Sequence, residues 1–238
     1  MGILIACTVI GLWGIHLLWT LTLPVLDLSS PVPYLHILLQ GYLYTGLFIT
    51  AHDSMHGSVS RYRRVNRFFG QLCLWLFAAF PYQKMFVKHM EHHHYPGTGK
   101  DPDFSKHQNP VSWFFMFFFS YVTVVQIVTM ALLFNAMHYL LGVPIANLIL
   151  FWVLSAFLGT FQLFYFGTYM PHRLPHTSEM APHRSRTQKR NHLAAMLSCW
   201  FFGYHWEHHE YPNIPWWLLH TKKRASDPIQ SPPAGVIQ

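Results

Sequence analysis

The chain has 238 residues, of which 52% are hydrophobic and only 11% carry a formal charge, against about 25% charged residues in an ordinary soluble domain. This composition excludes a soluble globular enzyme and a disordered chain. The 16 Lys and Arg residues outnumber the nine Asp and Glu residues, and because several apolar runs are too long for an aqueous surface, we expect this charge to face a membrane surface and not nucleic acid.

Four apolar runs are long enough to cross about 30 Å of hydrocarbon as α-helices. They cover residues 3–23, 34–51, 111–141 and 145–169. A Pro-rich turn follows the first run and a Gly-Val-Pro turn joins the third to the fourth, so the pattern predicts two helical hairpins. The first run lacks the features of a signal peptide, and we expect it to stay in the protein. The expected fold is an all-α integral membrane protein with four transmembrane helices and additional interfacial helices.

A fifth apolar run, residues 68–80, is too short to cross and is expected to form an interfacial or buried helix. With that assignment all 16 Lys and Arg residues lie on one side of the membrane, which the positive-inside rule makes the cytoplasmic side. No flexible linker interrupts the chain before its Pro-rich end. We therefore expect one catalytic domain over residues 1–226, followed by a tail over residues 227–238.

Three clusters of histidines with helical spacing distinguish the sequence, which contains 18 histidines in all. The clusters are His52 and His56, then His89, His92 and His93, and finally His205, His208 and His209. Because positions i, i+3 and i+4 share one face of a helix, each cluster can direct two or three imidazoles at one point. The four-span topology puts all three clusters on the cytoplasmic side, where His172, at the end of the last run, also lies.

The number of imidazoles predicts two metal ions, because eight or nine exceed the roughly four to six ligands that one ion accepts. Imidazole suits iron, copper and zinc, and of these we favour iron that activates O2. A carboxylate-bridged di-iron site is excluded, because only Glu91 and His94 form the Glu-x-x-His pair that such a site needs twice. We expect His94 to lie beside the metal ligands and not among them.

Several acidic residues accompany the histidine clusters. A carboxylate commonly accepts the free N–H of a metal-bound imidazole and fixes the orientation of the ring. The candidates for this role are Asp53, Glu91, Asp103 and Glu207. Asp53 is the first choice because it directly follows a candidate ligand; Asp101 and Glu210 lie close to the clusters, and charge balance against nearby lysines is the alternative role. The phenylalanine-rich residues 114–119 are interpreted as side chains that face the lipid.

The residues around the histidines carry a family resemblance. They include YTGLFITAHDSMHG at residues 44–57, KHMEHH at 88–93, FGTY at 166–169 and GYHWEHH at 203–209. Together these motifs resemble the bacterial and cyanobacterial β-carotene ketolases of the membrane fatty-acid desaturase and hydroxylase superfamily, and the similarity extends from about Tyr42 to Trp217. Residues 200–202 are Trp-Phe-Phe, where many members of the family are expected to have a histidine.

The resemblance implies a non-haem di-iron oxygenase that acts on a carotenoid dissolved in the bilayer. Successive O2-dependent hydroxylations would convert the methylene at C4, and at C4′, of the β-ionone rings to a ketone, which gives echinenone and canthaxanthin. Electrons would come from an external donor such as ferredoxin, an acidic protein that could dock on the basic loops. By the same resemblance the metal ligands are His52, His56, His89, His92, His93, His205, His208 and His209, with His172 as a ninth, and no catalytic residue is expected beyond the metal centre.

The chemistry of an allylic C–H bond agrees with this interpretation. Such a bond carries no group that a general acid or base could activate, so its oxidation needs a metal or cofactor. The sequence contains no nucleophile elbow, no phosphate-binding loop and no dinucleotide fingerprint. Two alternatives use the same metal centre, namely an acyl-lipid desaturase and a carotenoid ring hydroxylase. A membrane metal transporter is the alternative outside enzymes, and the gathering of the clusters at one face disfavours it.

Overall fold

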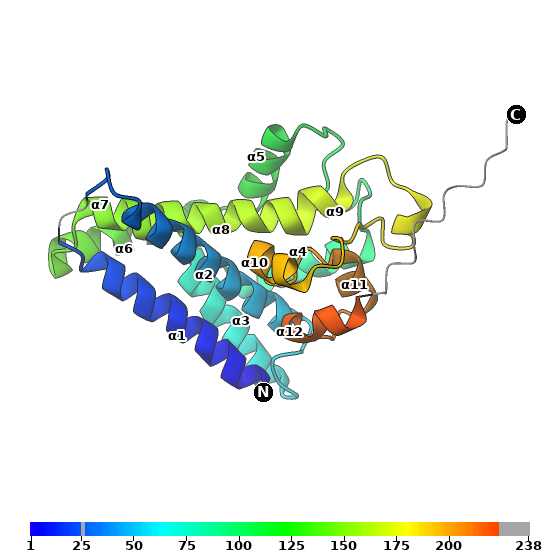
Figure 1. The fold of residues 1–238 in the computed structure, drawn as a ribbon, viewed down its shortest axis with the longest axis horizontal. Helices are drawn as coiled ribbons and strands as arrows, with labels where there is room; N and C mark the ends of the chain where they lie inside the picture. The colour runs from blue at the N-terminus through cyan, green and yellow to red at the C-terminus, as the bar shows by residue number, and fades with distance from the viewer. Residues whose placement is uncertain (25–26, 224–238) are drawn as a thin grey trace, which may run out of the picture.

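The computed structural model describes residues 1–24 and 27–223, and these residues form helices joined by loops (Figure 1). The expected all-α fold class is therefore confirmed. The first six helices are α1 Gly2–Leu21, α2 Val32–Met55, α3 Arg63–Ala78, α4 Tyr82–His94, α5 Pro110–Tyr121 and α6 Val124–Leu141. The tail predicted over residues 227–238 lies outside the described residues.

One long helix, Ile145–His172, follows α6. Its successive parts are α7 Ile145–Asn147, the π-helical η1 Leu148–Leu154, α8 Ser155–Leu163, the π-helical η2 Phe164–Tyr169 and α9 Met170–His172. Short helices complete the described chain: η3 Ser178–Met180, α10 His192–Cys199, α11 His205–Glu210, α12 Trp216–Leu219 and η4 His220–Lys222. Figure 1 shows that α10, α11 and α12 fold over the end of the bundle at which α2 ends.

The helix α2 is the centre of the fold, with α1, α3 and α8 packed against it. Gly41 on α2 and Gly159 on α8 mark a close approach of two backbones. A Cβ atom at Gly41 would lie 3.1 Å from Cβ of Leu158, and one at Gly159 would lie 3.0 Å from Cβ of Tyr44. Small residues at such a crossing let apolar helices pack tightly inside a membrane. This crossing fixes the direction in which the last turn of α2 points.

Three helices among the described residues are long and apolar enough to cross a membrane: Gly2–Leu21, Val124–Leu141 and Ile145–His172. They agree with the first and fourth predicted spans and with the second half of the third. The predicted span at residues 34–51 lies within α2, but α2 is not one of these three helices. The reason is that α2 is buried against its neighbours, so its sequence includes polar residues such as Gln40 that a lipid-facing helix would not need.

The third predicted span is wrong as a single helix. The chain leaves the helical conformation at Val122 and Thr123, which are extended and separate α5 from α6. The Thr123 side chain accepts the backbone N–H of Gln126 and so caps the start of α6. Because the apolar run is continuous in sequence, hydropathy gives no sign of the helix end at this cap. As a result α5 projects from the bundle as a separate helix (Figure 1).

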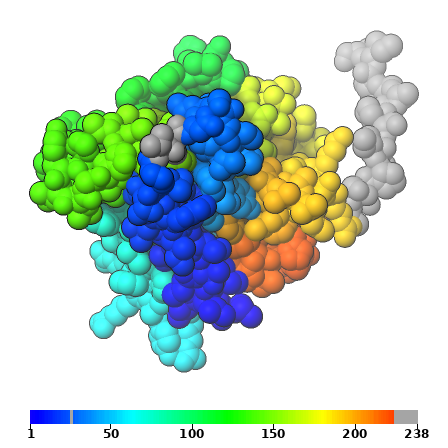
Figure 2. All heavy atoms as spheres, turned by 60° about the vertical axis from the view of Figure 1, so that its left-hand side comes forward, coloured from blue at the N-terminus to red at the C-terminus, as the bar shows by residue number. Residues whose placement is uncertain are grey.

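The end of α1, the start of α2 and the turn between α6 and α7 lie at one end of the molecule, on the left of Figure 1, and the histidine-bearing helices α4, α9 and α11 lie toward the other. Figure 2 brings the turn end forward and shows the N-terminal helices in blue beside the green residues of α6 and α7. The predicted short helix at residues 68–80 is found as α3, which buries one face against α2 and does not meet the length of a span.

Candidate metal centre

Nine histidines from four parts of the chain converge at one end of the helix bundle. The last turn of α2, the second half of α4, the end of α9 and the whole of α11 meet there. The nine are His52, His56, His89, His92, His93, His172, His205, His208 and His209. The structure therefore brings together every histidine that the sequence predicts for the site, whereas their role as metal ligands stays a prediction.

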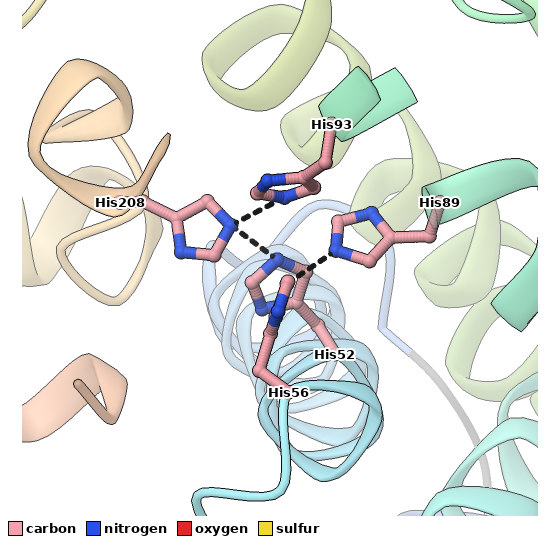
Figure 3. Close-up of side chains that lie close together, drawn as sticks. All are labelled: His52, His56, His89, His93 and His208. Atoms are coloured by element: carbon pink, nitrogen blue, oxygen red, sulfur yellow. Dashed lines mark hydrogen bonds between the residues drawn. The ribbon is translucent and has the colours of Figure 1, made fainter. Parts of the chain in front are cut away.

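Five of these histidines form a first group, shown in Figure 3. The rings of His52 and His56 from the end of α2, His89 and His93 from α4 and His208 from α11 point toward one another. One ring nitrogen of each lies within 4.8 Å of those of the other four. The Nε2 atoms are 2.7 Å apart in His56 and His89, 2.9 Å apart in His93 and His208, and 3.0 Å apart in His52 and His208.

The other four histidines form a second group, and all four are buried. They are His92, His172, His205 and His209, again with ring nitrogens within 4.8 Å of one another. Nε2 of His209 lies 3.2 Å from Nε2 of both His92 and His205. The two groups are adjacent because His92 and His93 are neighbours on α4, as are His208 and His209 on α11. Each of these two helices thus contributes to both groups.

Hydrogen bonds alone do not account for these short separations between nitrogen atoms. A neutral imidazole has one N–H donor and one lone pair, yet Nε2 of His208 faces Nε2 of both His52 and His93. Nε2 of His172 is buried and has no hydrogen-bond partner among the described residues. Lone pairs that converge on one point suit a shared cation, and a set of nitrogen donors suits iron, copper or zinc. The residues present therefore fit two metal ions, one in each group.

Burial keeps most of these imidazoles neutral. It lowers the pKa of His205, His208 and His209 well below the ordinary value of 6.5, and it lowers the pKa of His56 to about 4. A neutral imidazole presents its lone pair without a proton that a metal ion would first have to displace. The pKa of each of these four rings therefore favours metal binding at neutral pH.

Two histidines of the second group are oriented by acceptors on their other ring nitrogen. Nδ1 of His92 donates to the carboxylate of Asp101 at 3.0 Å, and Nδ1 of His172 donates to the backbone carbonyl of Arg184 at 3.0 Å. A carbonyl oxygen only accepts, so the proton of His172 lies on Nδ1 and its Nε2 lone pair faces the centre of the group. Both contacts fix a tautomer that presents Nε2 to a metal ion.

The carboxylate of Asp101 is itself held in place. It accepts the backbone N–H groups of Gly97 at 2.8 Å and Asp103 at 2.9 Å. Although burial raises the pKa of this carboxyl, the neighbouring His92 and these N–H groups bring it below the ordinary value, so Asp101 is ionised. In turn, although burial lowers the pKa of His92, the charge of Asp101 raises it above its ordinary value. Asp101 therefore makes His92 a more basic ligand.

We predict that Asp101→Asn weakens metal binding about 10- to 100-fold, which is the usual cost of losing such an outer partner of a ligand. The variant loses the negative charge beside His92 and one acceptor for the backbone N–H groups. The measurement is a competition titration of the purified protein with a metal chelator. Glu91→Gln is the matched control, because Glu91 lies on the same helix as His92 but is exposed. Equal affinities for the two variants would contradict the role of Asp101.

The four acids named from the sequence differ in their positions, and of these Asp103 lies close to His92 and Asp101, with one ligand atom of each within 4.8 Å of the others. The Asp53 carboxylate accepts the backbone N–H of Trp216 at 2.9 Å, and its other oxygen is 3.5 Å from Nδ1 of His52, too long for a regular hydrogen bond. Asp103 accepts the hydroxyl of Tyr121, and burial raises its pKa to about 6. Asp53 therefore ties α2 to the start of α12, and does not orient a histidine.

Glu207 and Glu91 also differ from the prediction. Glu207 is buried and forms an ion pair with Lys223 at 3.1 Å, together with a hydrogen bond from the hydroxyl of Thr187. Glu91 is exposed, as is His94, whose Nδ1 lies 2.8 Å from the carbonyl of Met90. The prediction that Glu91 supports a ligand is therefore wrong, because its position on α4 turns it away from the two groups of histidines.

An apolar pocket leads to the two groups of histidines. His52, His89, His92 and His205 line it, and its walls also include aromatic residues from α2, α3 and α5. These aromatic residues are Phe48, Phe77, Phe117, Phe118 and Tyr121, and Phe80, which follows α3, also lines the pocket. Of the run at 114–119, therefore, two members line the pocket, while Phe115 and Phe119 are exposed as expected of lipid-facing residues. The sequence interpretation of this run agrees with the exposure of these two residues and is wrong for the two that line the pocket.

The Trp-Phe-Phe segment that precedes α11 contributes to the same wall. Trp200 and Phe201 adopt left-handed backbone conformations, with φ of 48° and 60°, and so make the tight turn between α10 and α11. This turn directs the ring of Phe202 against two histidines, with ring centroids 4.9 Å from His52 and 5.0 Å from His205. Phe202 lines the pocket as an apolar contact at the position where a histidine was expected in relatives.

Comparison with known proteins identifies relatives over almost the whole chain. The profile of the family described as "Fatty acid desaturase" matches residues 29–134 and 121–236. A "Beta-carotene ketolase" of Haematococcus lacustris is 38% identical over 256 residues, which is 94% of this chain and 79% of that protein. A "Beta-carotene ketolase" of a Paracoccus species is 36% identical, with 95% of this chain and 93% of that protein covered.

One further relative is named for a different substrate. A "Zeaxanthin 4-ketolase" of Chlamydomonas reinhardtii is 41% identical over 233 residues, which is 92% of this chain and 52% of that protein. No solved structure matches the chain. The three relatives are thus all named as carotenoid ketolases, one of them as a 4-ketolase, and they differ in the carotenoid named.

Proposed function

We propose that this chain, which belongs to the fatty acid desaturase family and within it to the β-carotene ketolases, oxidises carbon 4 of the β-ionone ring of β-carotene to a ketone. The observation that carries this proposal is the aromatic-lined pocket whose wall includes His52 and His89 of the first group and His92 and His205 of the second. Such a pocket accepts a hydrocarbon ring, and a membrane protein receives this substrate from the bilayer in which the substrate is dissolved.

Two hydroxylations at one carbon account for the product. Each inserts one oxygen atom of O2 into a C–H bond at C4 and reduces the other oxygen atom to water, with two electrons and two protons supplied from outside. The second hydroxylation gives a geminal diol, which loses water and leaves the ketone. Oxidation of one ring gives echinenone, and oxidation of both rings gives canthaxanthin.

Two iron ions would supply the O2 activation that no side chain offers. The first group, with His52, His56, His89, His93 and His208, would hold one ion, and the second group, with His92, His172, His205 and His209, would hold the other. The chain itself holds the rings of His92 and His172 in orientation through Asp101 and the carbonyl of Arg184. The aromatic walls of the pocket place the ring and exclude water from it.

The chain is a membrane protein, and we propose that α2 is its fourth crossing. It has 24 residues, which is enough to cross, and it packs against the candidate spans α1 and α8. The three candidate spans contain no Lys or Arg, and those residues occur only from residue 61 onward. The positive-inside rule then puts the histidine groups on the cytoplasmic face.

The electron donor that we propose is an acidic protein such as ferredoxin. Exposed basic residues are available for it on the same side, among them Arg184 on the loop that also supports His172. Complementary charge would speed the encounter and orient the donor, and added salt would weaken the interaction. The lipid bilayer is the other partner, and nothing in this arrangement calls for nucleic acid.

The pigment profile of aerobic cells that accumulate β-carotene and express this chain tests the function. We expect new chromatographic peaks with the red-shifted, smoothed spectra of a carbonyl conjugated to the polyene, and their ratio reports whether one or both rings react. Ring-hydroxylated products with unshifted spectra would instead support the ring hydroxylase. Unchanged β-carotene in the presence of iron-loaded protein and reductant would contradict the ketolase and favour an acyl-lipid desaturase. Uptake of labelled metal into vesicles would support the transporter.

A further inference from the structure

Thr168 is exceptional among the threonines that the structure describes. A threonine inside a helix commonly donates its hydroxyl to the carbonyl four residues earlier, as Thr45, Thr50 and Thr160 do here with Gly41, Gly46 and Ala156. Thr168 lies in the π-helical η2 and makes no such bond. Within residues 1–24 and 27–223 it is the threonine whose hydroxyl has no hydrogen-bond partner, although the residue is only 5% exposed.

Thr168 is a buried residue in an apolar pocket wall, and a hydroxyl without a protein partner in such a place calls for an explanation. A π-helical turn shifts the carbonyl groups that an α-helix would offer to a threonine, and such turns occur frequently at functional sites. Here the turn leaves the Thr168 hydroxyl free at the end of the helix that closes with His172, four residues later and on the same face. The position of the free hydroxyl therefore points to a ligand near the second group of histidines.

The surroundings of Thr168 show where that ligand would lie. Thr168 lines the apolar pocket together with His92 and His205 of the second group. Other hydroxyls that line the pocket are already engaged, since Thr160 donates to the carbonyl of Ala156 and Tyr121 donates to Asp103. Among the described residues of the pocket wall, Thr168 is therefore the side chain with a hydroxyl free for a bound molecule.

We propose that Thr168 binds the C4 hydroxyl of the half-oxidised ring and holds that alcohol in place for the second oxidation. The inference rests on the proposed ketolase function and adds a positioning residue to it. β-Carotene has no polar atom and gains nothing from Thr168, whereas the alcohol formed in the first oxidation both donates and accepts hydrogen bonds. The hydroxyl therefore distinguishes the intermediate from the substrate, so that the alcohol leaves the pocket more slowly than the hydrocarbon does.

Two substitutions separate the hydroxyl from the shape of the side chain. Thr168→Val keeps the branched shape without the hydroxyl, and Thr168→Ser keeps the hydroxyl without the methyl group. Binding of β-carotene and of 4-hydroxy-β-carotene is measured by quenching of the tryptophan fluorescence of the purified protein. We expect Thr168→Val to weaken binding of the alcohol about two- to tenfold, the effect of one lost hydrogen bond, and to leave binding of β-carotene unchanged. Thr168→Ser should retain the preference for the alcohol.

The products give a second readout. In cells that contain β-carotene, Thr168→Val should release 4-hydroxy-β-carotene, with a ratio of alcohol to ketone about two- to tenfold above that of the unchanged protein. Thr160→Val is the matched control for this ratio, because its hydroxyl also lines the pocket but is already bonded to Ala156. We expect this control to leave the ratio of alcohol to ketone unchanged.

The outcomes distinguish this inference from the function on which it rests. If the unchanged protein forms ketone while Thr168→Val alters neither the affinity for the alcohol nor the product ratio, the role of Thr168 is wrong and the ketolase stands. Equal weakening of alcohol and hydrocarbon binding would also overturn it, since that result indicates packing alone. If the unchanged protein forms neither alcohol nor ketone, the proposed function fails, and the role of Thr168 fails with it.

Discussion

Replacing His208 by alanine is expected to abolish ketone formation and to lower the metal content from about two ions per chain to about one. Nε2 of His208 faces Nε2 of both His52 and His93, so the change removes the imidazole that links α11 to α2 and α4 within the first group. The loss of activity should exceed about 100-fold, because the loss of an outer partner of a ligand alone costs about 10- to 100-fold.

The second group allows the same experiment on the other ion. His205→Ala should also lower the metal content to about one ion and abolish activity, because His205 belongs to the second group. Both variants should accumulate in the membrane, since each removes one side chain from the end of the bundle and leaves the helix crossings intact. Metal is measured by elemental analysis of the purified protein, and ketone by chromatography of the pigments.

His94→Ala is the matched control for these two variants. His94 directly follows His93 on α4, yet it is exposed and its ring faces the carbonyl of Met90. We expect two ions per chain and full ketone formation in this variant. Full activity in His208→Ala, or active unchanged protein with a metal content near zero, would show that the two groups are not metal sites.

The helices of this fold were largely predictable, because membrane helices need long apolar runs that a sequence displays directly. The break between α5 and α6 was not, since residues 111–141 are apolar on both sides of it. The local signal was Thr123, a residue type that commonly caps a helix, followed three residues later by Gln126. A capping threonine within an apolar run is thus a more informative sign of a helix end than hydropathy is.

The sequence predicts which histidines form the site, but it does not predict which residues orient their rings. Helical spacing shows which imidazoles of one segment share a face, but it gives no means of dividing nine of them between two groups. That division needs the relative rotation of α2, α4 and α11. Asp53 was favoured as the partner of His52 because the two are adjacent in sequence. Adjacent side chains of an α-helix point in different directions, so adjacency is a poor guide to such a contact. The partner that orients His92 is Asp101, which a turn after α4 brings back to the ring.

The largest effect that we expect from a residue outside the histidines is at Gly167. A Cβ atom there would lie 2.2 Å from Cε1 and 2.7 Å from Cδ1 of Phe202, far closer than carbon atoms approach without a clash. Phe202 cannot simply rotate away, because its ring packs against the rings of His52 and His205. Gly167→Ala therefore displaces Phe202 toward one histidine of each group. A displacement near 1 Å at a reacting centre costs about 100-fold in rate, and we expect a loss of about 10- to 100-fold in ketone formation.

A second substitution tests whether this clash is the cause. Phe202→Ala removes the two atoms that the new Cβ would meet, so Gly167→Ala combined with Phe202→Ala should be more active than Gly167→Ala alone. Gly11→Ala is the matched control, because a Cβ atom there meets nothing within 4 Å, and this variant should keep full activity. If Phe202→Ala lowers the activity of Gly167→Ala further, Phe202 does not transmit the effect, and the cost arises instead from the added methyl group in the pocket wall that Gly167 lines.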